Sequence, residues 1–156
     1  MILKPFDLSF VLTRILSKAI FMNLKATLTI LSVIGISTLF AADADTSKLP
    51  PASDKKDVTY AKDIKPLFDA SCIKCHGDQK PKGKLRLDSL EGVMKGGVDG
   101  KVIEAGNSAK SMLVLNIAHL GDEDEFMPPP KNKLGIKELT PEQIGLVRAW
   151  IDQGAE

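Results

Sequence analysis

The sequence is poor in aromatic residues, in cysteine and in excess charge of either sign. Aromatic residues make up 5% of the 156 residues, there are two cysteines, and the formal net charge is +1. Nucleic-acid-binding domains normally have a basic face and a high isoelectric point, so this charge balance argues against that class. The shortage of aromatic side chains also leaves a domain of this size with little material for a large core.

The chain also lacks a strongly apolar run of the length that spans a membrane. Its most apolar stretch reads ATLTILSVIGISTLFAA and is diluted by Thr and Ser, whereas a spanning helix needs about 20 apolar residues. Lys25 precedes this stretch and Asp43 follows it. This order is typical of a secretory signal peptide. We therefore expect residues 1–42 to be a signal region cleaved between about Ala41 and Ala44, with an uncleaved anchor facing the periplasm as the alternative.

The parts that flank this stretch suggest how the remaining chain is organised. The first 21 residues are an awkwardly long prelude, whereas Met22 followed by Lys25 would be an ordinary start for a signal peptide. We therefore expect synthesis to begin at Met22, with an amphipathic membrane-surface helix over the first 21 residues as the alternative. Residues 43–57 are rich in Pro, Ser and charge without apolar periodicity, which predicts a flexible linker. Residues 58–156 then form the exported domain, in the periplasm.

No part of the exported domain has the alternation of a β-strand, and several segments have helical features. One helix is expected to begin near Asp63, with Asp63 as its cap, because Pro66 is tolerated only in a first turn. Residues 88–94 and 108–120 favour two more helices. The clearest helix follows Thr140, where the letters TPEQ form a capping box with Pro at the first helical position. The sequence therefore predicts an all-α domain of small helices joined by long loops.

Both cysteines and one of the two histidines lie in the segment SCIKCHG, residues 71–77. A disulfide across two residues would close a small, strained loop. A redox dithiol would need a strand-to-helix junction, and no strand is evident. A zinc site needs four ligands, of which this segment supplies three and His119 would be a distant fourth.

Covalent haem attachment is the fourth interpretation of the same segment and the one we favour, because CxxCH is its attachment motif. Two thiols, those of Cys72 and Cys75, would add to the two vinyl groups on one edge of a porphyrin. The next residue, His76, would place its imidazole under the iron. Export agrees with this interpretation, because bacteria attach haem c outside the cytoplasm.

A haem iron also needs a sixth ligand or a vacancy, and the candidates are Met94, Met112, Met127 and His119. Met112 and His119 lie in an apolar helical run, where such residues are more often core or surface than ligands. Met127 lies instead in the segment FMPPP, where proline fixes φ and stiffens the loop. A thioether on such a loop can be held rigidly against iron, so we predict Met127 as the ligand.

The order of motifs along residues 58–156 resembles the planctomycete-type cytochrome c domain, a branch of the small class I-like c-type cytochromes. The resemblance rests on CxxCHG, on LRLDS from Leu85, on the Gly96–Gly97 pair, on Gly106 with the SML that follows it, on MPP from Met127, and on the ending WIDQGA. It implies haem c on Cys72 and Cys75, His76 as proximal ligand and Met127 as distal ligand. It also implies a small cytochrome c-like helical fold around the covalently bound haem.

Met/His ligation leaves no open coordination position and raises the reduction potential. We therefore expect an electron carrier, not an enzyme, that transfers single electrons between periplasmic or membrane redox proteins. The alternative is a haem enzyme or sensor with a labile sixth ligand, peroxidase-like or gas-binding, for which His119 is the available distal acid or base. Redox proteins are the expected partners, with no nucleic acid and no small-molecule substrate. Contact with a membrane is expected only through an uncleaved signal segment.

Two further side-chain roles are expected on weaker grounds. Arg86 is either a partner for a haem propionate or an exposed charge in a lysine-rich segment. Trp150 and Phe68 are expected to pack in the core.

Overall fold

The C-terminal helix α6, Pro141–Asp152, carries much of the core in a computed structural model that describes residues 44–156. Thr140 caps this helix, because its hydroxyl accepts from the Gln143 amide while the Gln143 side chain accepts from the Thr140 amide. Pro141 follows at the first helical position. The predicted capping box is therefore confirmed. The prediction of a signal peptide over residues 1–42 lies outside the described residues.

The other elements are short. Residues 44–156 contain no strand, apart from an isolated antiparallel bridge between Gly97 and Gly100. In chain order the elements before α6 are η1 Thr46–Lys48, η2 Tyr60–Ile64, α2 Lys65–Ser71, α3 Ile73–His76, η3 Lys82–Lys84, α4 Leu90–Lys95, η4 Ser108–Lys110, α5 Met112–Ile117 and η5 Glu123–Glu125. The predicted all-α class is thus confirmed. Among these residues, no helix has the length and apolar character that a membrane crossing requires.

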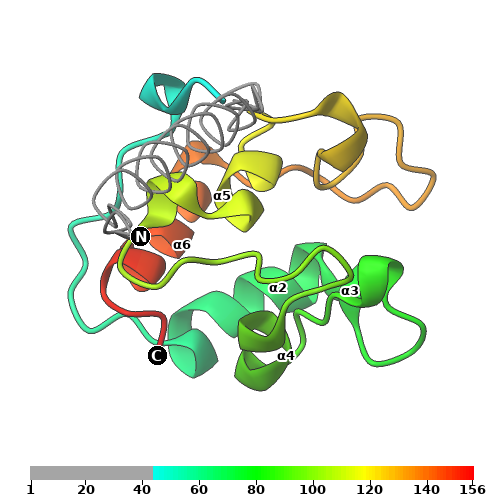
Figure 1. The fold of residues 1–156 in the computed structure, drawn as a ribbon, viewed down its shortest axis with the longest axis horizontal. Helices are drawn as coiled ribbons and strands as arrows, with labels where there is room; N and C mark the ends of the chain where they lie inside the picture. Colours follow the sequence, from blue (N-terminus) through cyan, green and yellow to red (C-terminus); the bar gives the residue numbers. More distant parts are fainter. Residues whose placement is uncertain (1–43) are drawn as a thin grey trace, which may run out of the picture. The chain divides into compact units, whose positions relative to one another are not determined.

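Two groups of helices lie on opposite sides of the domain. Figure 1 shows α5 and α6 together in one group and α2, α3 and α4 in the other. The aromatic residues connect the groups near the C-terminus, because Tyr60 lies 5.8 Å from Trp150 and 6.2 Å from Phe68 between ring centroids. Trp150 and Phe68 are fully buried, so their predicted role in the core is confirmed. The Trp150 indole donates to the Glu156 carbonyl at 2.8 Å.

The segment expected to be a linker has several contacts with α6. Leu49 is buried, the Ser53 amide donates to the Gly145 carbonyl at 2.9 Å, and Arg148 donates to the Pro50 carbonyl. Gly145 permits this approach, since a Cβ there would lie 2.6 Å from the Pro51 carbonyl oxygen. We call residues 49–55 the strap.

The predicted helices differ from the observed ones mainly at their ends. Asp63 does not cap α2; its carboxylate accepts from the Thr59 amide at 3.0 Å and therefore closes the turn of η2 that precedes α2. The segment 108–120 is interrupted at Ser111, whose backbone is extended and whose hydroxyl donates to the Asn107 carbonyl at 3.0 Å. His119 has a left-handed backbone with φ of 55°, which ends this helical region.

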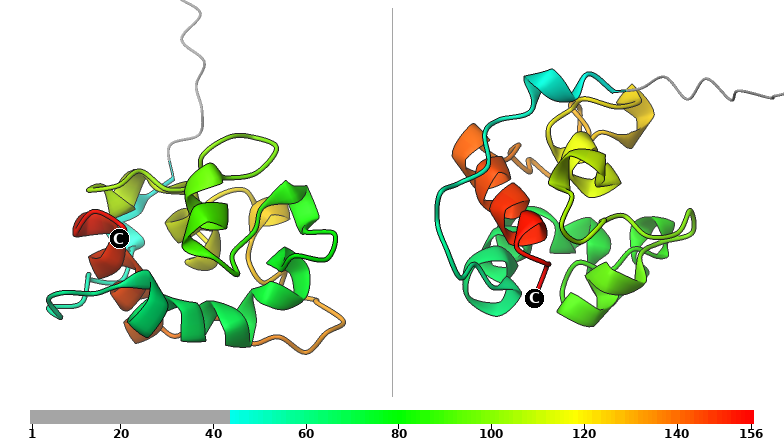
Figure 2. Two further views of the ribbon diagram at one scale, coloured as in Figure 1. Left: turned by 90° about the horizontal axis from the view of Figure 1, so that it is seen from below. Right: turned by 60° about the vertical axis from the view of Figure 1, so that its left-hand side comes forward.

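A long stretch without helix follows η5. Both views in Figure 2 show its later part, coloured orange, as a loop that leads into α6. Residues 126–139 make up this stretch, and we call it the methionine loop because Met127 lies near its start. It forms one wall of the candidate site.

Candidate functional site

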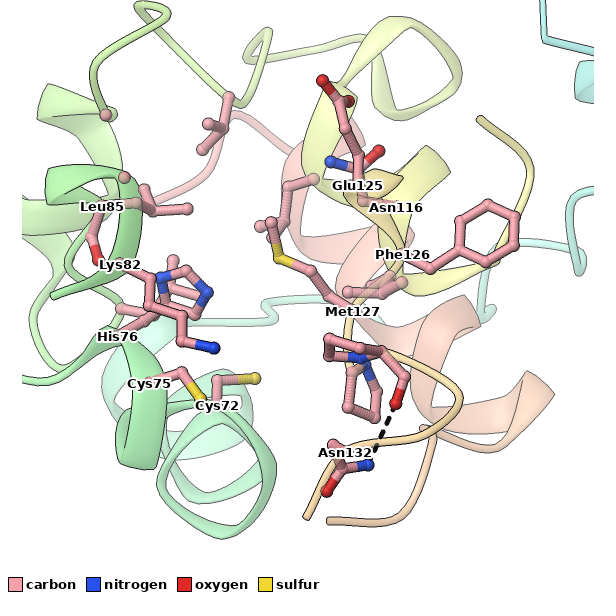
Figure 3. Close-up of a pocket in the computed structure, with 18 of the residues that line it drawn as sticks. Cys72, Cys75, His76, Lys82, Leu85, Asn116, Glu125, Phe126, Met127 and Asn132 are labelled. Carbon is pink, nitrogen blue, oxygen red and sulfur yellow. Dashed lines mark hydrogen bonds between the residues drawn. The ribbon is translucent and has the colours of Figure 1, made fainter. Parts of the chain in front are cut away.

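A cavity of about 630 Å³ separates the CxxCH segment from the methionine loop. Its lining includes Cys72, Cys75 and His76 on one side and Asn116 and Met127 on the other. Figure 3 shows these labelled side chains pointing into the space between the two walls. The structure therefore brings together all four residues predicted to hold a haem.

The CxxCH residues share one side because the backbone makes a single helical turn there. The amides of Cys75 and His76 both donate to the Cys72 carbonyl, at 3.0 and 2.9 Å. The turn ends at Gly77, where a Cβ would lie 2.8 Å from the Ile73 carbonyl oxygen. A glycine after the motif thus lets the chain leave the helix without a clash.

His76 has one ring nitrogen held by the protein and the other directed at the cavity. Its Nδ1–H donates to the Leu85 carbonyl at 3.1 Å, and since a carbonyl only accepts, this bond fixes the tautomer. Nε2 then has its lone pair free and faces the methionine wall (Figure 3). Burial lowers the pKa of His76, which favours the neutral imidazole that binds metals. The Leu85 carbonyl was missed by the sequence analysis, because an irregular turn places it beside His76.

The two thiols lie at one end of the cavity and form no disulfide. Burial, and secondarily the charge of Cys75, raises the pKa of Cys72 to about 12. Reactive dithiols have a lowered thiol pKa, so this environment is unlike that of a redox enzyme. Within residues 44–156, no three His, Cys, Asp or Glu side chains gather as they would around a metal ion, which gives no support to a zinc site.

Met127 is held at its backbone and directs its side chain inward. Its amide donates to the Asn116 carbonyl at 3.1 Å, and its sulfur faces His76 across the cavity in Figure 3. Pro128 follows immediately and is buried. Met127 therefore lies on the cavity wall opposite His76, and its role as the sixth ligand stays a prediction.

The other three candidate ligands are placed less favourably. His119 does not line the cavity; its ring stacks on Phe126, with centroids 4.5 Å apart and an interplanar angle of 5°. Met94 is 36% exposed and Met112 is 38% exposed. Met112 reaches the cavity wall, whereas Met94 does not.

Charged groups around the site also have definite positions. Arg86 forms a bidentate hydrogen bond with Asp88, at 2.9 and 2.6 Å, and does not line the cavity. The predicted alternative of an exposed charge therefore describes Arg86 better than a propionate partner. Lys82 does line the cavity, and its side chain is drawn beside His76 and the cysteines in Figure 3.

The donor set and its enclosure define a class of site. The cavity is largely apolar and lies in an all-α domain. It has two thiols at one end and an imidazole nitrogen that faces a thioether, and this set of groups fits the requirements of a c-type haem. Residues 72–131 match the family model described as Planctomycete cytochrome C, and this match supports a planctomycete-type cytochrome c domain in this region. The match indicates a haem-containing redox protein. It begins at the first cysteine and extends past Met127. No curated protein and no solved structure matches the chain.

Proposed function

We propose that this protein is a haem c electron carrier that passes single electrons between periplasmic or membrane redox proteins. One observation carries the proposal: His76 Nε2 and the Met127 sulfur face each other across the cavity. A haem iron between them would have both axial positions filled by the chain. A carrier needs no open position, because its electrons move without a bond between iron and substrate.

Four residues would hold the group. Cys72 and Cys75 would attach it covalently, and His76 and Met127 would be its axial ligands. When bound, haem supplies the reversible one-electron chemistry of iron, and Met/His ligation raises its potential. The chain's own contribution is to enclose and orient the group. The Leu85 carbonyl orients the His76 ring, and the Asn116 carbonyl holds the backbone of Met127.

An enzymatic or gas-sensing role would need a vacant or labile sixth position with an acid or base above it. His119 was the predicted candidate for such a group. Its ring instead packs on Phe126 outside the cavity lining. The carrier role is therefore the one that the arrangement of side chains favours.

The charged residues at the cavity rim suggest how partners dock. Exposed residues of both signs line the cavity, and they are Lys82, Lys131, Lys133, Asp99, Asp124 and Glu125. Exposed charges steer encounters and are screened over about 8–10 Å at physiological salt. We expect electron-transfer rates with a natural partner to fall as salt is added. Rates that are indifferent to salt with both acidic and basic partners would contradict this mode of docking.

Spectroscopy of periplasmically matured protein tests the proposal. Haem absorbance should survive denaturation, and the oxidised protein should show the weak far-red charge-transfer band of sulfur bound to iron. Met127→Ala should abolish this band, lower the reduction potential and increase cyanide affinity. His119→Gln is the matched control and should leave the band in place. Ready binding of cyanide or carbon monoxide by the wild type would instead support the enzymatic role.

A further inference from the structure

The hydrogen bond that orients the His76 ring depends on a turn with an uncommon backbone. Its acceptor, the Leu85 carbonyl, follows directly after the turn η3. Within this turn, Gly83 and Lys84 both have a left-handed backbone, with φ of 58° and 55°. A residue other than glycine is strained in that conformation, so the turn is costly at Lys84. We therefore expect a contact from outside the turn to hold it in place.

A small hairpin rich in glycine supplies such a contact. In residues 96–100, the amides of Gly97 and Gly100 each donate to the carbonyl of the other, at 2.9 and 3.3 Å. We call these residues the glycine hairpin. At its tip, the Val98 amide donates to the Gly83 carbonyl at 2.8 Å. The glycine hairpin is thus bonded to the middle of the turn that presents the Leu85 carbonyl to His76.

Gly97 allows the hairpin to approach the turn this closely. A Cβ at this position would lie 2.7 Å from the Gly83 carbonyl oxygen and 3.3 Å from the Leu85 Cβ. The hairpin therefore packs against the same two residues that set the position of the Leu85 carbonyl. Gly83, Leu85, Gly97 and Val98 all line the cavity. The contact between hairpin and turn is accordingly part of the cavity lining.

We propose that Val98 is a positioning residue for His76, because its amide holds the turn that keeps the Leu85 carbonyl on the His76 Nδ1–H. This inference rests on the proposed function, since it takes His76 as the proximal ligand. A hydrogen bond from Nδ1–H makes the other ring nitrogen more basic, and a more basic ligand favours oxidised iron. The glycine hairpin therefore lowers the reduction potential by way of the imidazole.

Val98→Pro and Val98→Ala form a matched pair that tests this role. Both remove an exposed side chain, but only proline removes the amide hydrogen and places a ring carbon there. Val98 is the first of the two tip residues of the hairpin, and neither Val98 nor Asp99 has a positive φ. Proline is favoured at this position of such a turn. We therefore expect Val98→Pro to keep the hairpin and lose its bond to Gly83.

Three measurements on the haem-loaded protein give the result. In the reduced state of Val98→Pro, solvent exchange of the His76 Nδ1–H, followed by proton NMR, should become about fivefold faster, the factor that one hydrogen bond is worth. The reduction potential should rise, because the imidazole becomes a weaker donor. The far-red band should stay in place, because Met127 lies on the opposite wall. Val98→Ala should match the wild type in all three, and Gly97→Ala should resemble Val98→Pro by displacing the turn.

The readouts distinguish the possible failures. Equal Nδ1–H exchange and equal potential in Val98→Pro and Val98→Ala would overturn the proposal, and so would a shifted far-red band with unchanged Nδ1–H exchange. A wild type without covalent haem would overturn the proposed function and this inference with it. Should neither Val98→Pro nor Gly97→Ala fold, hydrogen exchange of the wild type decides. The Val98 amide and the His76 Nδ1–H should then be protected together, and an unprotected Val98 amide beside a protected Nδ1–H would overturn the role of the hairpin.

Discussion

The domain has two regions whose side chains find their packing and hydrogen-bond partners in different ways. Around α6, aromatic and aliphatic side chains pack on one another, and the Trp150 indole and the Tyr60 hydroxyl each find a backbone carbonyl. Around the cavity, the His76 imidazole, the Asn116 amide and the Met127 sulfur point instead into a shared space. The polar groups of the aromatic residues near α6 are paired within the protein, whereas the cavity region directs the candidate haem ligands into the space between its two walls. We therefore expect the function to depend on the cavity region and the stability of the fold to depend on both regions.

The largest effect is expected from loss of both attachment points, in Cys72→Ala with Cys75→Ala. Without the proposed haem, the two cavity walls no longer pack against a shared group. The small core around α6 is then the main source of stability for the whole domain. We expect a largely unfolded chain, seen as loss of helical circular dichroism and of a cooperative thermal transition. A compact variant that melts cooperatively would show that the α6 region suffices.

Trp150→Ala tests the other region directly. Trp150 is fully buried against Tyr60 and donates to the Glu156 carbonyl. Truncation of a buried Trp lowers the free energy of unfolding by about 3–5 kcal/mol, which urea denaturation would measure. The spectrum of the folded fraction should remain that of the wild type, because Trp150 does not line the cavity. A changed far-red band at low urea would mean that the two regions are not independent.

Arg148→Met should release the strap at a smaller cost. Arg148 donates to the Pro50 carbonyl and to the Ser108 hydroxyl, the latter at 3.1 Å. Loss of hydrogen bonds from a charged donor lowers the free energy of unfolding by about 1–3 kcal/mol. Limited proteolysis within residues 49–55 should accelerate. Unchanged protection of the strap would show that Leu49 and the Ser53 amide hold it without Arg148.

The smallest effect is expected for Asp63→Asn and should depend on pH. The Lys55 amine and then the Thr59 amide lower the pKa of Asp63. A folded-state pKa below the unfolded value stabilises the fold above the unfolded pKa, and this contribution disappears as pH falls through the folded pKa. The variant should therefore be less stable than the wild type near neutral pH, and the two should converge in acid. A difference that persists in acid, measured by urea unfolding, would rule out the charge as its cause.

Local signals in the sequence predicted the parts of the fold that local contacts determine. The capping box at Thr140 and the turn of CxxCH depend on residues within a few positions of each other, so both were predictable. The resemblance to the cytochrome family was likewise confirmed, whereas the haem-binding roles of individual residues stay predictions that the geometry supports.

Long-range contacts account for what the sequence did not predict. The break at Ser111 depends on the Glu104 amide, which donates to its hydroxyl at 2.9 Å, and no helical periodicity carries that information. The composition of the strap predicted a linker, yet its contacts with α6 and with Gln153, the residue after it, use the backbone carbonyls of Pro50 and Lys55. Backbone carbonyls have no signature in composition. The roles of Leu85 and Asn116 were missed for a similar reason, since their carbonyls, rather than their side chains, hold the two candidate ligands.

Gly145 has no side chain, and this lets the backbone of the strap approach α6 closely. The methyl carbon of an alanine there would lie 2.6 Å from the Pro51 carbonyl oxygen, so the strap would have to move away from the helix. Gly145 does not line the cavity. Gly145 is thus a position at which the attachment of residues 49–55 to α6 can be changed separately from the candidate site. An alanine at position 145 would therefore lengthen the segment that is detached from the domain on its N-terminal side, while the residues that line the cavity stay the same.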